Sequence, residues 1–323
     1  MAPESERTEL EYRRIDMHMH AITPRYRSAF ISATGLDSVF GAPAWSVEQH
    51  LAVMNRYVTR LGVLSVPPPG VFFGDSGAAR ELSREMNEEY ARLVVQNPGR
   101  FAALACLPLP DIDASLQEIR YALDDLGLDG VGLFSNVVGT YLGAREFEPV
   151  LQELNRRESL VFVHPAPPRA AALERYPVWL MELPFDTTRT IVDLLYSGAL
   201  ERYRHIRFLF PHLGGTLPYL AHRLASLIAR EEGWSPNVPR GPLHYMERLT
   251  FDTAQSDNRP ALNSVLALSG ETKIVYGSDW PYAVMGAEPD PQPGVAELDK
   301  GLRSAIEWDN PLGLMPELKR HLS

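Results

Sequence analysis

The chain has 323 residues, of which 45% are hydrophobic and 22% charged, and its formal net charge is −10 at pH 7. This acidic balance argues against a nucleic-acid partner, whose phosphates would need a surplus of lysine and arginine, and no long apolar run indicates a membrane span. With Cys106 as the single cysteine, no intrachain disulfide can form, which fits the reducing environment of the cytoplasm.

Residues 1–13 are charged and lack an apolar signal core, so they are predicted to be a disordered lead-in. Residues 14–323 are predicted to form a single domain. Short, near-continuously apolar runs recur along this part, as expected for parallel strands that are covered on both faces. The predicted strands are 14–19, 61–66, 101–107, 130–135, 160–164, 206–211, 249–253 and 273–278.

Amphipathic segments separate these runs. A capping box at Ser46–Gln49 opens a helix that is predicted to run to about Arg60. Two long connections, 21–45 and 67–78, are rich in Gly, Pro and aromatic residues and are predicted to be loops. The other predicted helices are 79–96, 113–127, 146–157, 186–203, 216–232, 242–248 and 259–269. Eight buried strands alternating with helices predict a (β/α)8 TIM barrel, with its active site at the C-terminal ends of the strands.

Five residues of metal-ligand type fall at the ends of the predicted strands. His18 and His20 are two apart on the first strand and should point to one face, with Met17 and Met19 on the other. The remaining three are His164, His212 and Asp279. Singly, each histidine is compatible with a hydrogen-bonded core residue, and Asp279 with a turn or helix cap. Because all five converge on one rim, we predict a metal site there.

The chain resembles the amidohydrolase superfamily, and within it the branch of metal-dependent decarboxylases. The motifs that carry the resemblance are D-x-H-x-H at 16–20, V-H-P at 163–165, P-H-L-G-G-T-L-P-Y-L at 211–220, F-D-T-A at 251–254 and G-S-D-W-P at 277–281. The chain is most similar to 6-methylsalicylate decarboxylases, through Y-L-G at 141–143, F-x-P at 147–149, L-x-R-R at 154–157 and D-L-L-x-S-G at 193–198. Aminocarboxymuconate semialdehyde decarboxylases have a similar layout.

The resemblance implies roles for individual residues. It makes His18, His20, His164 and Asp279 the metal ligands and His212 a catalytic residue beside the metal. It also implies that Trp179 and Trp280 line the substrate pocket. Arg223 matches an arginine that reaches the substrate of a neighbouring subunit, which implies a homodimer; a solvated helix charge is the alternative for this residue.

The sequence favours a single divalent metal ion. Two-metal relatives bridge their ions with a carboxylated lysine or a glutamate at the end of a middle strand. Here the only lysines are Lys273, Lys300 and Lys319, and the fourth predicted strand ends in Ser135-Asn136. Three imidazoles and a carboxylate suit zinc, with manganese possible.

The chemistry that follows is the decarboxylation of a salicylate-type aromatic carboxylate such as 6-methylsalicylate, releasing CO2 and a phenol. We expect the metal to chelate the carboxylate and the adjacent phenolate, and Asp279 to deliver a proton to the carbon that bears the carboxylate. His212 would help to move that proton. The alternative is a metal-dependent hydrolase of a lactone or amide, in which the same site activates water.

Overall fold

The computed structural model describes residues 14–36, 42–169, 175–227, 235–283 and 290–322. Eight parallel strands form one sheet in the order β1-β2-β3-β4-β7-β8-β9-β10. Their bounds are Arg14–His20, Thr59–Ser65, Phe101–Cys106, Gly130–Phe134, Leu160–His164, Arg207–Phe210, Thr250–Asp252 and Ile274–Val275. Every predicted strand is thus present, although the last three are shorter than predicted. The predicted lead-in at 1–13 lies outside the described residues.

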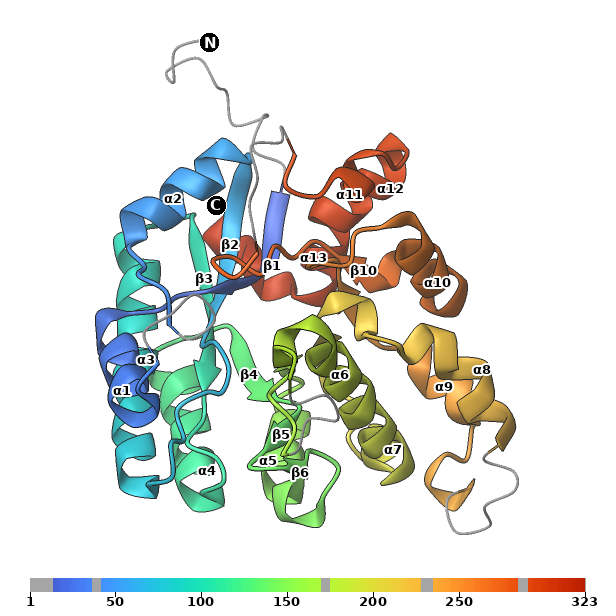
Figure 1. Ribbon diagram of the computed structural model, residues 1–323, viewed down its shortest axis with the longest axis horizontal. Coiled ribbons are helices and arrows are strands. Elements are labelled where there is room, and N and C mark those ends of the chain that lie inside the picture. Colours follow the sequence, from blue (N-terminus) through green and yellow to red (C-terminus); the bar gives the residue numbers. More distant parts are fainter. Residues whose placement is uncertain (1–13, 37–41, 170–174, 228–234, 284–289, 323) are drawn as a thin grey trace.

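The helices surround the strands (Figure 1). They are α1 Pro24–Thr34, α2 Val47–Arg56, α3 Ser76–Gln96, α4 Ile112–Arg120, α5 Glu148–Arg156, α6 Val178–Tyr196, α7 Ala199–Arg202, α8 Leu217–Leu227, α9 Pro242–Met246, α10 Arg259–Ser269, α11 Pro293–Ala296, α12 Lys300–Ser304 and α13 Asn310–Leu314. A short antiparallel hairpin, β5 Asn136–Val137 and β6 Thr140–Tyr141, follows β4. No helix among the described residues has the length and apolar character that crossing a membrane requires.

Three of the predicted elements are wrong in part. The helix predicted to run to about Arg60 ends at Arg56, and β2 begins at Thr59. The connection 21–45 contains α1, which begins with Thr23 as its N-cap and ends at Gly35 in the left-handed conformation. The predicted helix 186–203 begins earlier, at Val178, and is divided by Gly198, whose φ of 79° breaks the helix. The end predicted for helix 216–232 lies outside the described residues.

The barrel closes between β1 and the segment after β10. The amide of Met17 donates to the carbonyl of Tyr276 at 2.9 Å, and that of Asp279 to the carbonyl of His18 at 2.8 Å. The amide of His20 donates to the carbonyl of Trp280 at 2.7 Å. These bonds join the two edges of the sheet, and they place Asp279 directly beside the His-x-His pair. The predicted (β/α)8 barrel is confirmed.

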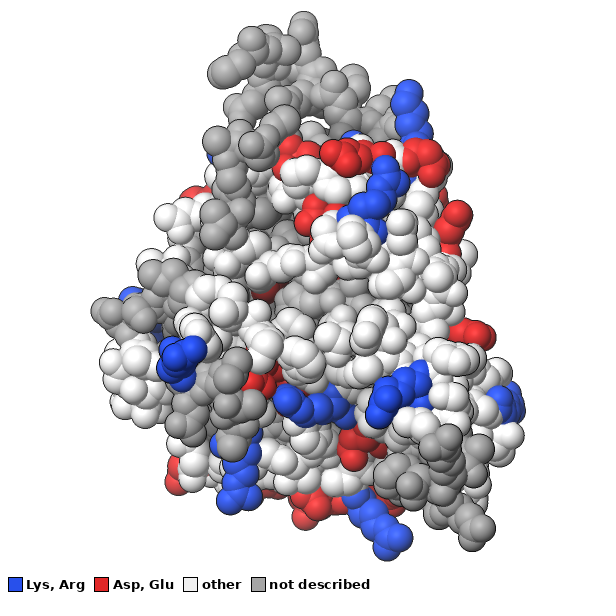
Figure 2. Space-filling model, turned by 45° about the vertical axis from the view of Figure 1, so that its right-hand side comes forward, with Lys and Arg blue, Asp and Glu red and all other residues white. Residues whose placement is uncertain are grey.

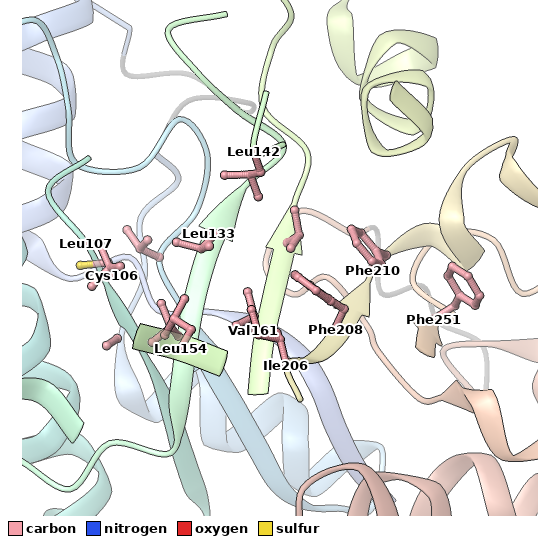
Figure 3. Close-up of a cluster of buried hydrophobic side chains, with 14 of the residues drawn as sticks. Cys106, Leu107, Leu133, Leu142, Leu154, Val161, Ile206, Phe208, Phe210 and Phe251 are labelled. Atoms are coloured by element: carbon pink, nitrogen blue, oxygen red, sulfur yellow. The ribbon is translucent and has the colours of Figure 1, made fainter. Parts of the chain in front are cut away.

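The core has two parts. The inner part fills the barrel with Ile15, Met17, Leu61, Val63, Ala102, Leu104, Leu160, Phe162, Leu209 and Val275, which are all buried. The outer part lies between strands and helices, where residues such as Leu133, Val161 and Phe208 pack together (Figure 3). Met17 therefore does not share a face with Met19, contrary to the prediction from strict alternation. A register shift between Asp16 and Met19 changes the direction of the side chains, as bulges near active sites often do.

The C-terminal segment closes the N-terminal end of the barrel. Met315 and Leu318 are fully buried and belong to the inner core, where they meet residues of β1, β2, β3 and β7. Beside them Arg14, only 2% exposed, donates from Nη2 to Glu307 Oε1 at 2.5 Å and to Asp290 Oδ2 at 2.9 Å. Its guanidinium also lies 4.5 Å from the ring centroid of Tyr276. A buried cation is thereby matched by carboxylates and an aromatic face.

Replacing Glu307 with alanine is expected to lower the free energy of unfolding by about 3 kcal/mol, because the substitution leaves the buried Arg14 with only part of its counter-charge. Urea unfolding followed by circular dichroism measures the change. Glu247→Ala, at an exposed position, serves as the control. A loss below about 1 kcal/mol for Glu307→Ala would show that Asp290 alone is sufficient.

Candidate metal centre and active site

Four of the predicted residues meet at the C-terminal end of the barrel. His18 and His20 come from β1, His164 ends β7, and Asp279 follows β10. One ligand atom from each lies within 4.8 Å of the others, and all four side chains are buried. His18 Nε2 and His20 Nε2 are each 3.2 Å from Asp279 Oδ1. Parallel strands bring these residues together although more than 250 positions separate the first from the last.

The donor atoms of this cluster fit a divalent cation. His164 Nε2 is buried and has no hydrogen-bond partner among the described residues, and Asp279 Oδ1 is buried against the Nε2 atoms of His18 and His20. Leaving such atoms without a partner is costly unless something else binds them. Three imidazole nitrogens and one carboxylate oxygen aimed at one point form a common ligand set for zinc and related ions. Their assignment as metal ligands remains a prediction.

The other ring nitrogen of each histidine is held from outside the cluster. His18 Nδ1 lies 2.9 Å from Asp252 Oδ2, and His20 Nδ1 lies 3.0 Å from Ser65 Oγ. His164 Nδ1 donates to the carbonyl of Pro165 at 2.8 Å. Contacts of this kind fix the orientation of a ligating imidazole and leave Nε2 free to bind the metal.

Burial and neighbouring charges shift the pKa values of His164 and His18. Burial, together with the neighbouring His20 and His18, lowers the pKa of His164 well below its usual value, so this imidazole is neutral and able to ligate. Burial also lowers the pKa of His18, but the carboxylates of Asp252 and Asp279 outweigh this effect and raise it to about 10. A cation that binds His18 would therefore displace a proton.

Two further aspartates organise the backbone around the cluster. Asp16 Oδ1 accepts from the amides of His18 and Ser278, both at 3.0 Å, and so ties the first strand to the segment before Asp279. Asp252 Oδ1 accepts from the amides of His212 at 3.1 Å and Ala254 at 3.0 Å. Asp252 thus links one predicted ligand, His18, to the predicted catalytic histidine.

Asp252→Asn is expected to weaken metal binding by about 10- to 100-fold, because an amide no longer provides the carboxylate charge that holds His18 Nδ1–H. Titration with a competing chelator measures the affinity. The exposed Asp113→Asn is the matched control and should bind metal like the unchanged protein. Equal affinities for both variants would exclude this role for Asp252.

His212 lies beside the cluster and outside the ligand set. Its Nε2 is 3.5 Å from Asp279 Oδ2, while its Nδ1 is buried without a hydrogen-bond partner among the described residues. The side-chain amide of Gln255 also donates to Asp279 Oδ2. His212, Gln255 and Asp279 all have positive φ, at 57°, 51° and 62°. Backbone strain of this kind is retained where the surrounding structure holds a functional group in place.

The three predicted substrate-binding residues lie in different surroundings. Trp280 directly follows Asp279, and its indole Nε1 is buried. Trp179, in the first turn of α6, is 41% exposed. Arg223 is exposed on α8 and lines a shallow surface groove with Tyr219. Trp280 is thus next to Asp279 in the chain, with its side chain packed against the outer part of the core, while Trp179 and Arg223 lie on helices α6 and α8.

Sequence reasoning gave no role to Ser65, Asp252, Gln255 or Tyr282. Asp252 lies in the F-D-T-A motif and ends a strand, which was a usable signal. The ring centroid of Tyr282 lies 5.5 Å from that of His20. Ser65, Gln255 and Tyr282 become part of the site only through contacts between distant segments.

Comparison with known families decides the classification. The amidohydrolase family model matches residues 15–315. The chain belongs to the amidohydrolase family. This amidohydrolase is 38% identical to the decarboxylase yanB of Aspergillus niger, over 84% of the chain and 77% of that protein. It is 35% identical to a 6-methylsalicylic acid decarboxylase of Aspergillus aculeatus, over 95% of the chain and 97% of that protein. The resemblance to the decarboxylase branch, and with it the predicted carboxy-lyase class, is confirmed.

Solved structures have the same fold. A crystal structure of an amidohydrolase II superposes with a TM-score of 0.87 and 27% identity, over 94% of this chain and 99% of that chain. A dihydroxybenzoic acid decarboxylase from Polaromonas, solved with manganese and 2-nitroresorcinol, superposes with a TM-score of 0.78 and 19% identity, over 94% and 96%. At 19% identity, the similarity to the Polaromonas structure shows that the two proteins share the barrel fold.

Proposed function

We propose that this amidohydrolase is a metal-dependent, non-oxidative decarboxylase of 2-hydroxybenzoates such as 6-methylsalicylate. The observation that carries the proposal is the buried cluster of His18, His20, His164 and Asp279, with His212 beside it. The similarity to named 6-methylsalicylic acid decarboxylases supports the substrate class. The products would be CO2 and the corresponding phenol.

The two carboxylate oxygens of Asp279 have different neighbours, and we propose a different role for each. A bound divalent ion would hold the carboxylate and phenolate of the substrate and stabilise their charge. Asp279 Oδ1 faces His18 and His20, while Oδ2 faces His212 and Gln255. Oδ2 is therefore the atom from which a proton can reach the ring carbon, and His212 can supply that proton in turn. Burial of the cluster excludes bulk water and strengthens these interactions.

One ion per chain is proposed, with zinc favoured because three imidazoles and one carboxylate suit it. Manganese, which the Polaromonas decarboxylase holds, is the competing ion. Elemental analysis of the protein purified without added metal distinguishes the two, and a content near two ions per chain would contradict a single-metal site.

A homodimer and a cytoplasmic location are part of the proposal. Large apolar side chains are exposed on α6 and α8: Trp179 at 41%, Leu180 at 59%, Phe185 at 37% and Tyr219 at 87%. Figure 2 brings forward the side on which α8 lies and shows a broad area of uncharged residues between scattered charges. Exposed apolar surface of this kind favours association, and the exposure of Arg223 on α8 supports its proposed role across such an interface. Sedimentation equilibrium tests the dimer.

The experiment for the function is to supply the metal-loaded protein with 6-methylsalicylate, salicylate and a panel of simple lactones. Release of CO2 and appearance of 3-methylphenol from 6-methylsalicylate are expected. Acid production from lactones without CO2 release would instead support the hydrolase alternative, in which the same site activates water.

A further inference from the structure

A cavity of about 420 Å³ opens where β3, β4 and β7 end. Its wall is mainly apolar and includes Val71, Leu107, Leu109, Leu133, Phe134 and Val137. Figure 3 shows Leu107, which directly follows β3, and Leu133 on the neighbouring strand β4. Side chains usually fill protein interiors to the density of organic crystals, so an apolar space of this size is a feature to explain. Pockets of roughly 300–1,000 Å³ with mostly apolar walls are typical ligand sites.

Phe134 lies between the cavity and the cluster of His18, His20, His164 and Asp279. This residue of β4 pairs in register with His164 of β7, and the two ring centroids are 6.3 Å apart. Ala166, two residues beyond His164, lines the cavity as well. A molecule held at His164 is therefore one side chain away from an apolar space.

Gly132 lines the cavity and, having no side chain, does not fill any of it. It pairs with Phe162, whose ring centroid lies 4.8 Å from that of His18. A Cβ atom added at Gly132 would meet only the carbonyl oxygen of Ala105, at 3.8 Å, which is an ordinary contact. A larger side chain at this position would occupy the cavity without a clash at its Cβ. At Gly70, by contrast, φ is +87° and a Cβ would lie 2.5 Å from the ring of Phe134.

We propose that this cavity binds an apolar ring substituent longer than methyl, so that the substrates include 2-hydroxybenzoates with an alkyl chain of several carbons at position 6. The inference rests on the proposed decarboxylase function, since the carboxylate and hydroxyl must be anchored at the metal cluster. The ring of 6-methylsalicylate carries a single methyl group, which leaves the space beyond Phe134 unused. Each further methylene buried there raises kcat/KM by up to about fourfold.

The experiment compares 6-methylsalicylate with 6-pentylsalicylate. The unchanged, metal-loaded protein is expected to favour the pentyl substrate in kcat/KM by about tenfold or more. Gly132→Leu should remove that preference by lowering kcat/KM for the pentyl substrate at least tenfold, while the value for the methyl substrate stays within about twofold. Gly313→Leu, at an exposed helical position with open space around it, is the matched control. Gly132→Ala, a smaller change, should shift the preference in the same direction.

A wild-type protein that processes the methyl substrate but prefers it over the pentyl substrate by more than tenfold would overturn the cavity proposal alone. If neither substrate releases CO2, the decarboxylase function itself fails. Binding of 3-pentylphenol, measured by calorimetry, then decides on the cavity: tighter binding to the unchanged protein than to Gly132→Leu supports it, and equal binding contradicts it.

Discussion

Replacing His164 with alanine is expected to release the divalent ion and to lower kcat/KM for decarboxylation by at least about a thousandfold. His164 Nε2 is a buried donor atom without a partner in the described protein, and its Nδ1 is held by the carbonyl of Pro165. Its low pKa keeps the ring neutral and ready to ligate. Losing one ligand of four leaves His18, His20 and Asp279 with an incomplete set, which zinc and manganese bind far less tightly.

Elemental analysis after gel filtration measures the effect directly, with metal content falling to about a tenth of an ion per chain or less. His205→Ala removes an exposed imidazole just before the start of β8, at the end of the barrel opposite the four-residue cluster, and should change neither metal content nor activity. Full retention of metal by His164→Ala would remove this histidine from the ligand set, whatever happened to activity.

His212→Asn is expected to keep the metal and lose turnover, with kcat lower by about 100- to 10,000-fold. His212 Nε2 faces Asp279 Oδ2, where it can pass on a proton, and it does not belong to the four-residue cluster. Asparagine is chosen because it tolerates the positive φ of 57° at this position better than alanine. The hydrogen bond that the backbone amide of residue 212 donates to Asp252 Oδ1 is therefore preserved.

The measurement combines metal content with kcat over a range of pH. A merely structural role would leave the shape of the pH profile unchanged, whereas loss of a proton-transfer group removes one limb of it. If the variant loses its metal together with its activity, His212 acts as a ligand and the proposed division of roles is wrong.

Most of the fold could be predicted because most strands are short, largely apolar runs between recognisable helix boundaries. The helix α1 could not, since its surroundings are rich in Gly and Pro and its apolar periodicity is weak. The signals were nevertheless present: Thr23 as N-cap, Pro24 at the first position and Gly35 after the end. In α6 the interior Pro184 obscured a helix that the structure begins at Val178.

At the site, the convergence of His18, His20, His164 and Asp279 could be predicted because barrel topology alone brings strand ends together. The residues that orient them could not. Gln255 reaches Asp279 only because its backbone adopts a positive φ after β9, which no local pattern signals. The prediction that the side chains of Met17 and Met19 share one face was wrong for a related reason. The register shift in β1 depends on its pairing with β2, which the sequence of β1 does not signal.

The packing of residues 315–318 into the inner core has a consequence for folding during synthesis. Met315 and Leu318 belong to the same inner core as Ile15, so residues from the first strand and from far along the chain meet in one cluster. On the ribosome, the first strands emerge long before their last packing partners exist. The inner core of the nascent barrel therefore stays incomplete, with apolar surface exposed to aggregation, until residues 315–318 have been synthesised.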